Sequence, residues 1–136
     1  GDIATAVEMA QLIPEFTEPA DVTEYQKRLD GVPHLILIAL EDNNPVGFKV
    51  GYQKEDYFYS WMGGILPAFR KKGIAKLLAE KQETWAKSKG YKTLVFKTRN
   101  QHKNMLLFGI QNGFDIIGFT EKEAVSANRI LLKKVL

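Results

Sequence analysis

The segment Gly63-Gly-Ile-Leu-Pro-Ala-Phe-Arg-Lys-Lys-Gly-Ile-Ala75 decides the fold of this 136-residue chain. The aromatic-rich run from Tyr57 to Ile65 predicts a strand, and the apolar spacing after Pro67 predicts a helix. The segment is therefore a short basic loop that leads from a strand into a helix N-terminus. Free main-chain N–H groups and the helix dipole at such a place favour a diphosphate. Gly73 lacks the Cβ that would block the approach of that group.

Four basic side chains surround this loop, namely Arg70, Lys71, Lys72 and Lys76. Other phosphate-binding motifs are absent from the chain. Gly73 is followed by Ile74, so there is no G-x-x-x-x-G-K-[ST] sequence, and no G-x-G-x-x-G sequence occurs. A P-loop kinase and a dinucleotide dehydrogenase are therefore disfavoured.

Outward from the loop, hydrophobic periodicity predicts a mixed α/β chain whose basic helix forms a crossover between strands. Asp21, with Glu24 three residues later, predicts the N-cap of a helix. The pair Gly63-Gly64 predicts a bulge or a close backbone approach within its strand. The predicted helices run from Ile3 to about Gln11, from the N-cap Asp21 to a stop at Gly31, from the end of the basic loop near Gly73 to Gly90, and from about Met105 to Gly113. The predicted strands cover 34–40, 46–53, 57–65, 91–98, 114–120 and 128–136.

Length and composition indicate one globular domain over residues 1–136, with 45% apolar and 26% charged residues. The absence of cysteine excludes a disulfide framework and a thiolate metal site. With only His34 and His102, we expect no metal site. No apolar run approaches the roughly 20 residues that span a bilayer. No signal peptide is visible, and on that ground we expect a cytoplasmic protein; the start at Gly1 without Met leaves open that the N-terminus is trimmed.

Charge is distributed unevenly along the chain. Residues 1–69 carry a net charge of −7, residues 70–103 carry +9, and residues 104–136 carry +1. A strongly basic segment is suited to an anionic partner such as a phosphate or a nucleotide. Alternatively, its lysines solvate the outer face of a helix.

Four landmarks resemble the GNAT N-acetyltransferases. Arg70-Lys-Lys-Gly73-Ile-Ala75 resembles the family's Arg/Gln-x-x-Gly-x-Gly/Ala signature, and Ile65-Leu-Pro-Ala-Phe-Arg70 resembles its strand exit. The stretch from Met105 to Gly113-Phe114 is similar to the family's second helix, which ends in Gly-Phe. Val46-Gly47-Phe48 is similar to an earlier Val-Gly-Phe strand. The resemblance covers roughly residues 35–120.

The resemblance implies a GNAT-type α/β fold: a mixed, mostly antiparallel sheet with helices on both faces and a splayed central strand pair. It also implies acetyl-CoA as the cosubstrate and direct attack of a neutral amine on the thioester. Main-chain groups at Ile65 would bind the pantetheine arm and polarise the thioester carbonyl. The implied diphosphate contacts are Arg70, Lys71, Lys72, Gly73, Ile74 and Ala75. Asn100 and Asn104 lie where the family has a coenzyme-binding Asn, although its usual offset falls on His102; Asn100 could instead cap the helix.

Two departures from the family concern proton transfer. The family often has a Tyr four residues before the Gly of Gly-Phe, and here that position is Gly109. It often has a carboxylate on the strand before the loop, whereas this strand reads Ser60-Trp61-Met62. Glu55 and Asp56 lie in the preceding turn. Tyr59 is a weak catalytic candidate, and its spacing of two from Tyr57 and Trp61 fits one packed sheet face equally well.

Three functions compete at this stage. The first is an N-acetyltransferase acting on a primary amine, expected to belong to a cationic small molecule or peptide because the first two helices are acidic. The second is a non-catalytic acyl-CoA-binding or regulatory module. The third is a nucleic-acid-binding domain, disfavoured because no recognised motif is present. We expect neither nucleic acid nor membrane as a partner, and a homodimer remains open. The acidic residues near the first two helices are Glu15, Glu18, Asp21 and Glu24.

Overall fold

The computed structural model describes all residues from 1 to 136 and consists of four α-helices and one six-stranded sheet. The helices are α1 (Ile3–Gln11), α2 (Val22–Leu29), α3 (Ile74–Ser88) and α4 (Lys103–Gln111). The strands are β1 (His34–Glu41), β2 (Asn44–Lys54), β3 (Tyr57–Ile65), β4 (Thr93–Arg99), β5 (Asp115–Thr120) and β6 (Arg129–Val135). No helix here combines the length and the apolar character that crossing a bilayer requires.

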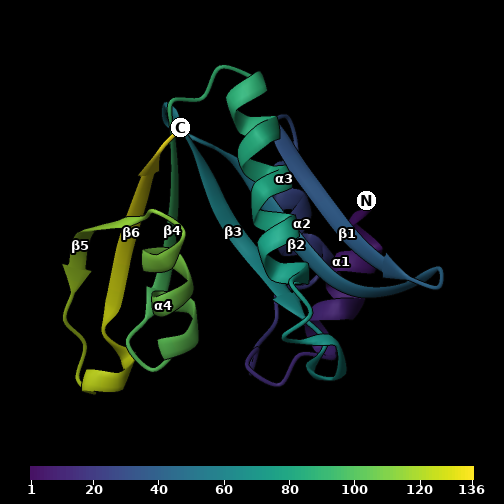
Figure 1. The fold of residues 1–136 in the computed structure, drawn as a ribbon, viewed down its shortest axis with the longest axis horizontal. Coiled ribbons are helices and arrows are strands. Elements are labelled where there is room, and N and C mark those ends of the chain that lie inside the picture. Colours follow the sequence, from purple (N-terminus) through teal and green to yellow (C-terminus); the bar gives the residue numbers. More distant parts are fainter.

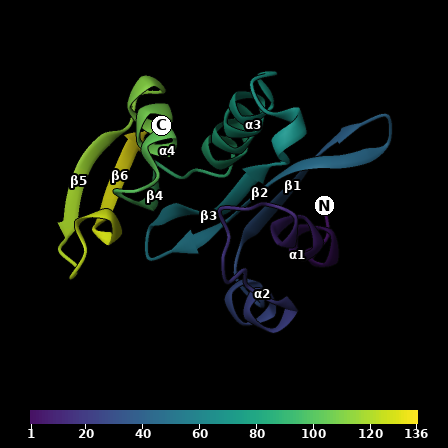
Figure 2. The same ribbon diagram turned by 90° about the horizontal axis from the view of Figure 1, so that it is seen from below.

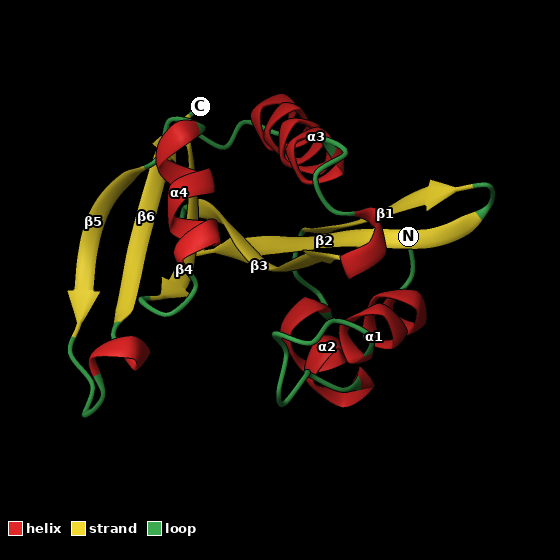
Figure 3. Cartoon of the chain, turned by 60° about the horizontal axis from the view of Figure 1, so that its bottom comes forward, coloured by secondary structure: helices red, strands yellow, loops and turns green.

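The sheet has the order β1-β2-β3-β4-β6-β5, and every neighbouring pair is antiparallel except β3 and β4. Helices α3 and α4 lie on one face of the sheet and α1 and α2 on the other (Figures 1–3). The parallel pair is the join made by the α3 crossover. This is the mixed, two-faced α/β architecture predicted from the sequence.

Local sequence signals explain where the helices begin and end. The Asp21 carboxylate accepts a hydrogen bond from the Glu24 N–H at 2.9 Å, which confirms the predicted N-cap of α2. Gly90 has a φ of 91° immediately after α3, as a left-handed residue that ends a helix should. Gly113 plays the same part after α4, with a φ of 89°.

Two apolar cores hold the layers together. The larger core packs α1 and α2 against β1–β3 and includes the fully buried Phe48 and Tyr25. The smaller core packs α3 and α4 against β3, β4 and β6 around Phe58 and Leu94. Both cores include residues of β3 and β4, so they join the two halves of the sheet where these strands pair.

Two sequence predictions need correction. The bulge lies at Trp61 rather than at Gly63-Gly64, because the β2–β3 register shifts between Val50↔Met62 and Gly51↔Ser60. The predicted close approach is correct for Gly64, where a Cβ would come within 2.6 Å of the Ile13 side chain.

Apolar spacing alone would place Leu77 with Ile74, Leu78 and Trp85 on the inner face of α3, but Leu77 is 53% exposed. The buried residues of α3 are instead Leu78, Ala79, Gln82 and Ala86. On α4, Ile110 is likewise 52% exposed. Both helices sit obliquely over a sheet that splits beneath them, so their buried faces are narrower than periodicity alone suggests.

Candidate functional site

The central feature of the site is a V-shaped opening between β3 and β4. Only two residue pairs join these strands, Phe58↔Leu94 and Tyr59↔Val95, both at the start of each strand. Beyond them the strands diverge, and β3 leans toward β1 and β2 while β4 stays with β5 and β6 (Figure 1). The strand splay expected from the resemblance is therefore present.

One edge of the V is unpaired main chain of β3. The Leu66 N–H donates to the Val46 carbonyl at 2.9 Å, so it faces β2. Because main-chain groups alternate in direction along a strand, the N–H groups of Ile65 and Gly63 face away from β2 and into the V. They are free to bind an amide or carbonyl that enters the opening.

The basic loop lies at the mouth of the V, beside the start of α3. Lys71 and Gly73 both adopt left-handed conformations, with φ of 63° and 80°. The main-chain N–H groups from Lys71 to Lys76 find no acceptor within the protein, and a Cβ on Gly73 would meet nothing within 4 Å. Consecutive free N–H groups beside an open space form a concave anion-binding surface.

Arg70 uses its side chain to brace this loop. Its Nε donates to the Ile65 carbonyl at 3.1 Å, and its two terminal nitrogens each lie 2.8 Å from a Glu15 carboxylate oxygen. This ion pair lowers the pKa of Glu15 through the hydrogen bond from Arg70. Arg70 thus joins the end of β3 to the segment between α1 and α2, and its guanidinium is occupied without any ligand.

The remaining loop cations are exposed. Lys72 lies 3.8 Å from Glu41 and 5.2 Å from the ring centre of Phe69, while Lys71 and Lys76 form no ion pair. Ile74 and Ala75 form the first turn of α3, so their contribution is their main-chain N–H groups. The structure therefore brings together Ile65, Lys71, Lys72, Gly73, Ile74 and Ala75 at one mouth of the V.

The two asparagines lie at the other side of the opening. The Asn100 side chain donates to the Val125 carbonyl at 3.3 Å and accepts from Lys103 at 2.8 Å, so it holds the local loop together. The alternative that Asn100 caps α4 is wrong, because the N-cap of α4 is His102 and no side chain caps that helix. Asn104 is exposed on the first turn of α4 and makes no hydrogen bond.

Tyr59 lies at the root of the V, on the face that carries α1 and α2. It packs edge-on against Tyr52 with ring centres 5.5 Å apart and belongs to the larger core. Burial raises its pKa, as expected for a phenol with little access to water. Lys54 and Lys97 lie over its ring, at 5.1 Å and 5.8 Å from the ring centre.

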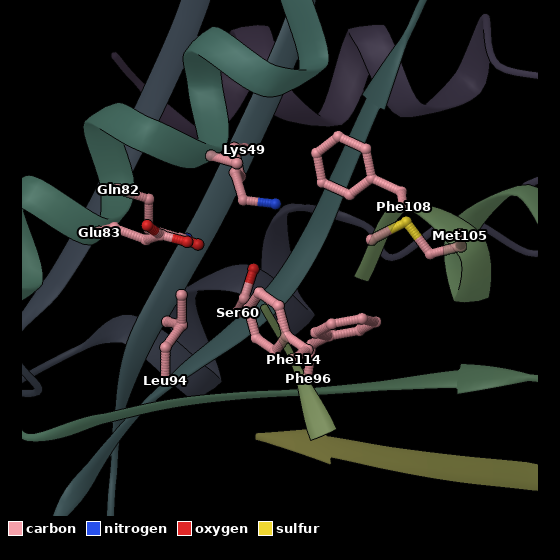
Figure 4. Close-up of a pocket in the computed structure, with 10 residues that line it drawn as sticks. Lys49, Ser60, Gln82, Glu83, Leu94, Phe96, Met105, Phe108 and Phe114 are labelled. Atoms are coloured by element: carbon pink, nitrogen blue, oxygen red, sulfur yellow. The ribbon is translucent and has the colours of Figure 1, made fainter. Parts of the chain in front are cut away.

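A small cavity on the α3 and α4 face contains residues that sequence reasoning missed (Figure 4). It measures about 10 Å³, enough for about one water molecule. Lys49 points its amine into it from β2, and burial lowers the pKa of this lysine to about 8. Gln82 from α3 is fully buried there, and neither polar atom of its amide has a partner. A Lys between Phe48 and Val50 in a strand predicts only an exposed position, so no sequence signal distinguished it.

The two family positions that this chain lacks can be placed in the structure. Gly109 packs on β4, where a Cβ would lie 2.7 Å from the Phe96 ring, so there is no room for a tyrosine. Ser60 on β3 lines the cavity beside Lys49. His34 hydrogen-bonds the Val32 carbonyl at 2.8 Å through Nδ1, away from the V.

The model of the acetyltransferase (GNAT) family matches residues 6–114. Among solved structures, the ribosomal-protein-S18-alanine N-acetyltransferase from Escherichia coli superimposes with a TM-score of 0.84 at 12% identity, covering 97% of this chain and 86% of its own. A GNAT family acetyltransferase from Elizabethkingia anophelis with acetyl-CoA bound gives 0.76 at 20% identity, covering 95% and 89%. A putative streptothricin acetyltransferase from Bacillus anthracis, in complex with acetyl coenzyme A, gives 0.76 at 23% identity, covering 89% and 71%. No curated protein sequence matches this chain.

Proposed function

Because the chain belongs to the acetyltransferase (GNAT) family, we propose that residues 1–136 act as one domain that transfers the acetyl group of acetyl-CoA to a primary amine, by direct attack in a ternary complex. The observation that carries the proposal is the row of free N–H groups from Lys71 to Lys76 at the mouth of the V. This row has the geometry for a diphosphate. The unpaired edge of β3 beside it has the groups for the pantetheine arm.

In the proposed reaction the Ile65 and Gly63 main chain polarises the thioester carbonyl as negative charge develops on its oxygen. The amine nitrogen attacks the carbonyl carbon, and the bond to sulfur breaks. Holding both substrates within one opening supplies much of the rate by proximity. Tyr59 is a weak candidate for proton transfer, because it is packed among aromatic rings at the root of the V.

For the acceptor, we propose an amine carried by a cationic small molecule or peptide. The support is the acidic charge of residues 1–69 and the exposed Glu18 between α1 and α2. Three neighbouring carboxylates are already engaged: Glu15 pairs with Arg70, Glu24 pairs with Arg28, and Asp21 caps α2. Of these four carboxylates, only that of Glu18 has no partner within the protein, so Glu18 carries most of the support for a cationic acceptor.

A specific observation favours a second acceptor class. Three cations have no ion-pair partner, namely Lys54, Lys97 and Arg129. Burial lowers the pKa of Lys97, and the positive charges of Lys54 and Arg129 lower it further. They lie around Tyr59, on the sheet face opposite α3. An amine that also carries a carboxylate or phosphate would fit these cations.

The first experiment is calorimetric titration with acetyl-CoA, with dephospho-coenzyme A as the control for the basic segment. We expect binding on the order of micromolar, followed by thiol release with at least one member of a panel of cationic, neutral and anionic amines. Binding without thiol release from any amine would replace the proposal with the non-catalytic acyl-CoA module. No binding to either coenzyme would overturn both.

We also propose a homodimer, supported by apolar side chains on the edge strand β5. Ile116, Ile117 and Phe119 are 57%, 48% and 64% exposed. Light scattering should then give twice the mass of the 15.4 kDa chain, and a monomer at high concentration would contradict the dimer. A cytoplasmic location stays a prediction of the sequence analysis.

A further inference from the structure

The cavity under α3 and α4 lies where the two central strands separate. Its walls come from β2, β3, β4, α3 and α4, with Phe114 just before β5, and most of the lining residues are apolar (Figure 4). Its polar groups are the Lys49 amine, the Ser60 hydroxyl, the Gln82 amide and the Glu83 carboxylate. Polar groups gathered in an otherwise apolar pocket usually have partners.

Here those partners are missing. Both polar atoms of the Gln82 amide are buried and unpaired, which costs free energy in a folded protein. The Lys49 amine forms no ion pair. The nearby Glu83 binds Lys134 with both carboxylate oxygens, at 3.0 Å and 3.1 Å. The half-buried Lys49 ammonium therefore lies near the Glu83 carboxylate without pairing with it, and its hydrogen-bonding capacity is free for a ligand atom.

The cavity lies along α3 from the basic loop. Gln82 lies nine residues from Gly73, which is about 14 Å at the rise of an α-helix. In the proposed complex, the arm of acetyl-CoA, held by its diphosphate at the loop, would run along β3 toward the cavity. Lys49 pairs in register with Gly63, and its Cγ would lie 3.5 Å from a Cβ at Gly63. The Lys49 side chain therefore starts beside the main-chain groups assigned to the thioester.

We propose that Lys49 is the catalytic acid that protonates the leaving sulfur of coenzyme A, in place of the tyrosine that Gly109 excludes. This inference rests on the proposed function. The acceptor nitrogen forms the new bond to carbon, and the C–S bond breaks with its electron pair on sulfur. The Lys49 ammonium gives a proton to that sulfur and yields the free thiol. The acceptor nitrogen loses its extra proton to water, and water returns one to Lys49.

The surroundings of Lys49 suit this role. The Lys49 amine faces the carboxylate of Glu83 on α3, which is itself paired with Lys134 of β6. Burial lowers the pKa of Lys49, and the negative charge of Glu83 raises it in part. The residues that α4, β3 and β4 contribute to the cavity are not charged, namely Met105, Phe108, Ser60, Leu94 and Phe96. The pKa of about 8 lies close to that of a thiol, about 8.5, so proton transfer between them is nearly balanced.

The first test needs no turnover. Free coenzyme A is bound to the protein, and its thiol is titrated by the ultraviolet absorbance of the thiolate. We expect the bound thiol of the wild type to ionise at lower pH than free coenzyme A, because the Lys49 ammonium stabilises the thiolate. In Lys49→Met this downward shift should disappear. An equal thiol titration in wild type and Lys49→Met would overturn the inference, whether or not the protein proves to be catalytic.

The second test is kinetic. Lys49→Met should lower kcat by about 10²–10⁴-fold while leaving the Kd for acetyl-CoA within about threefold. The wild-type kcat should fall above about pH 8, and this alkaline limb should be absent from Lys49→Met. Lys49→Arg should keep the lowered thiol pKa but donate its proton poorly. Lys81→Met, which removes an exposed lysine from α3, is the control and should behave as wild type.

The outcomes separate the two proposals. No thiol release from any amine, with the thiol shift lost in Lys49→Met, would reject the transferase and keep Lys49 as the thiolate partner. Thiol release that is equal in wild type and Lys49→Met would keep the transferase and reject Lys49. A loss of acetyl-CoA affinity as large as the loss of kcat would show a binding role and reject the acid.

Discussion

Gly73 is the residue on which the proposed coenzyme site depends most directly. Its φ of 80° is one that side chains with a branched Cβ adopt only with strain, and the space beside it is open. We predict that Gly73→Val raises the Kd for acetyl-CoA by about 100-fold or more, since its side chain would occupy the proposed diphosphate position. Calorimetric titration measures this.

The matched control is Gly90→Val. Gly90 has a φ of 91° and open space around it at the other end of α3, so the backbone strain is the same and the coenzyme site is untouched. Each variant should lose about 1–2 kcal/mol of stability. Equal acetyl-CoA affinities in the two variants would mean that the diphosphate lies elsewhere.

Tyr25 carries a prediction about stability. It is a fully buried residue of α2, its hydroxyl has no hydrogen-bond partner, and burial raises its pKa to about 12. Tyr25→Phe removes an unsatisfied polar group and should leave stability unchanged or raise it by about 1 kcal/mol. Tyr52→Phe, in contrast, removes the bond that Arg28 donates at 2.9 Å and should cost about 1 kcal/mol. Urea denaturation of both variants compares them, and a destabilised Tyr25→Phe would contradict the prediction.

For single residues, the sequence correctly predicted the roles that depend only on neighbours in the chain. The cap at Asp21 and the helix ends at Gly90 and Gly113 depend on neighbours within a few positions, so they could be recognised in one dimension. Lys49 could not be recognised in this way, because α3 helps to bury it, and the residues of α3 that line the same cavity lie some 30 positions later in the chain. The occupied side chain of Arg70 was missed for the same reason, since its partner Glu15 is 55 positions away.

Among the elements, β3 is the one at the centre of the proposed site, because its two edges lie in different environments. One edge is bonded to β2 over its whole length, and the other edge is paired with β4 only at Phe58 and Tyr59. The bulge at Trp61 lies where the strand changes between these states. Two consecutive glycines marked this strand as unusual but did not locate the bulge, because register depends on the partner strand.

Hydrogen exchange tests this description of β3. The amides of Gly63 and Ile65 face the V and should exchange rapidly in the free protein, and acetyl-CoA should slow them by about 10-fold or more as they bond to the ligand. Leu66 is the internal control, since its amide is already bonded to Val46 at 2.9 Å and should be protected in both states. Protection of Ile65 without ligand would show that the edge is closed.

The hydrophobic periodicity predicted where the helices lie in the chain better than it predicted which of their residues are buried. Each predicted helix exists, but Leu77 and Ile110 point to solvent while Gln82 is buried. A helix that lies over an intact sheet buries a wide stripe. Helices α3 and α4 instead stand on either side of the opening (Figure 2), and part of each inner face borders the V.

For the whole molecule, local patterns predicted the order of elements, whereas the opening between β3 and β4 was expected only from the family resemblance. Local patterns gave the strands and helices in sequence, and four motifs pointed to the family, yet the V exists only because β3 and β4 share two residue pairs. The uneven distribution of charge along the chain corresponds to a region of the folded protein. The basic stretch of residues 70–103 contains the loop, α3 and β4, which border the opening on two sides.

The buried lysine makes the stability of the whole molecule depend on pH. In the unfolded chain Lys49 has the ordinary lysine pKa of about 10.5, and in the folded protein the pKa is about 8. Between these values the unfolded state binds more protons, so the free energy of unfolding rises with pH. Below pH 8 both states are protonated and the full burial cost remains. Above pH 10.5 both are neutral and the cost is gone.

Lys49→Met isolates this effect from the other groups that titrate in the same range, such as Tyr25. At pH 7 the variant should be more stable than the wild type by about 1–3 kcal/mol, since a partly buried cation is replaced by a thioether of similar length. The difference should shrink as pH rises from 8 to 10, because the wild type then loses its buried charge. Urea titrations at pH 7, 8, 9 and 10 measure the difference directly. A difference that stays constant with pH would mean that the Lys49 amine keeps its ordinary pKa and reaches water, and the acid proposed for the leaving sulfur would then lack its buried site.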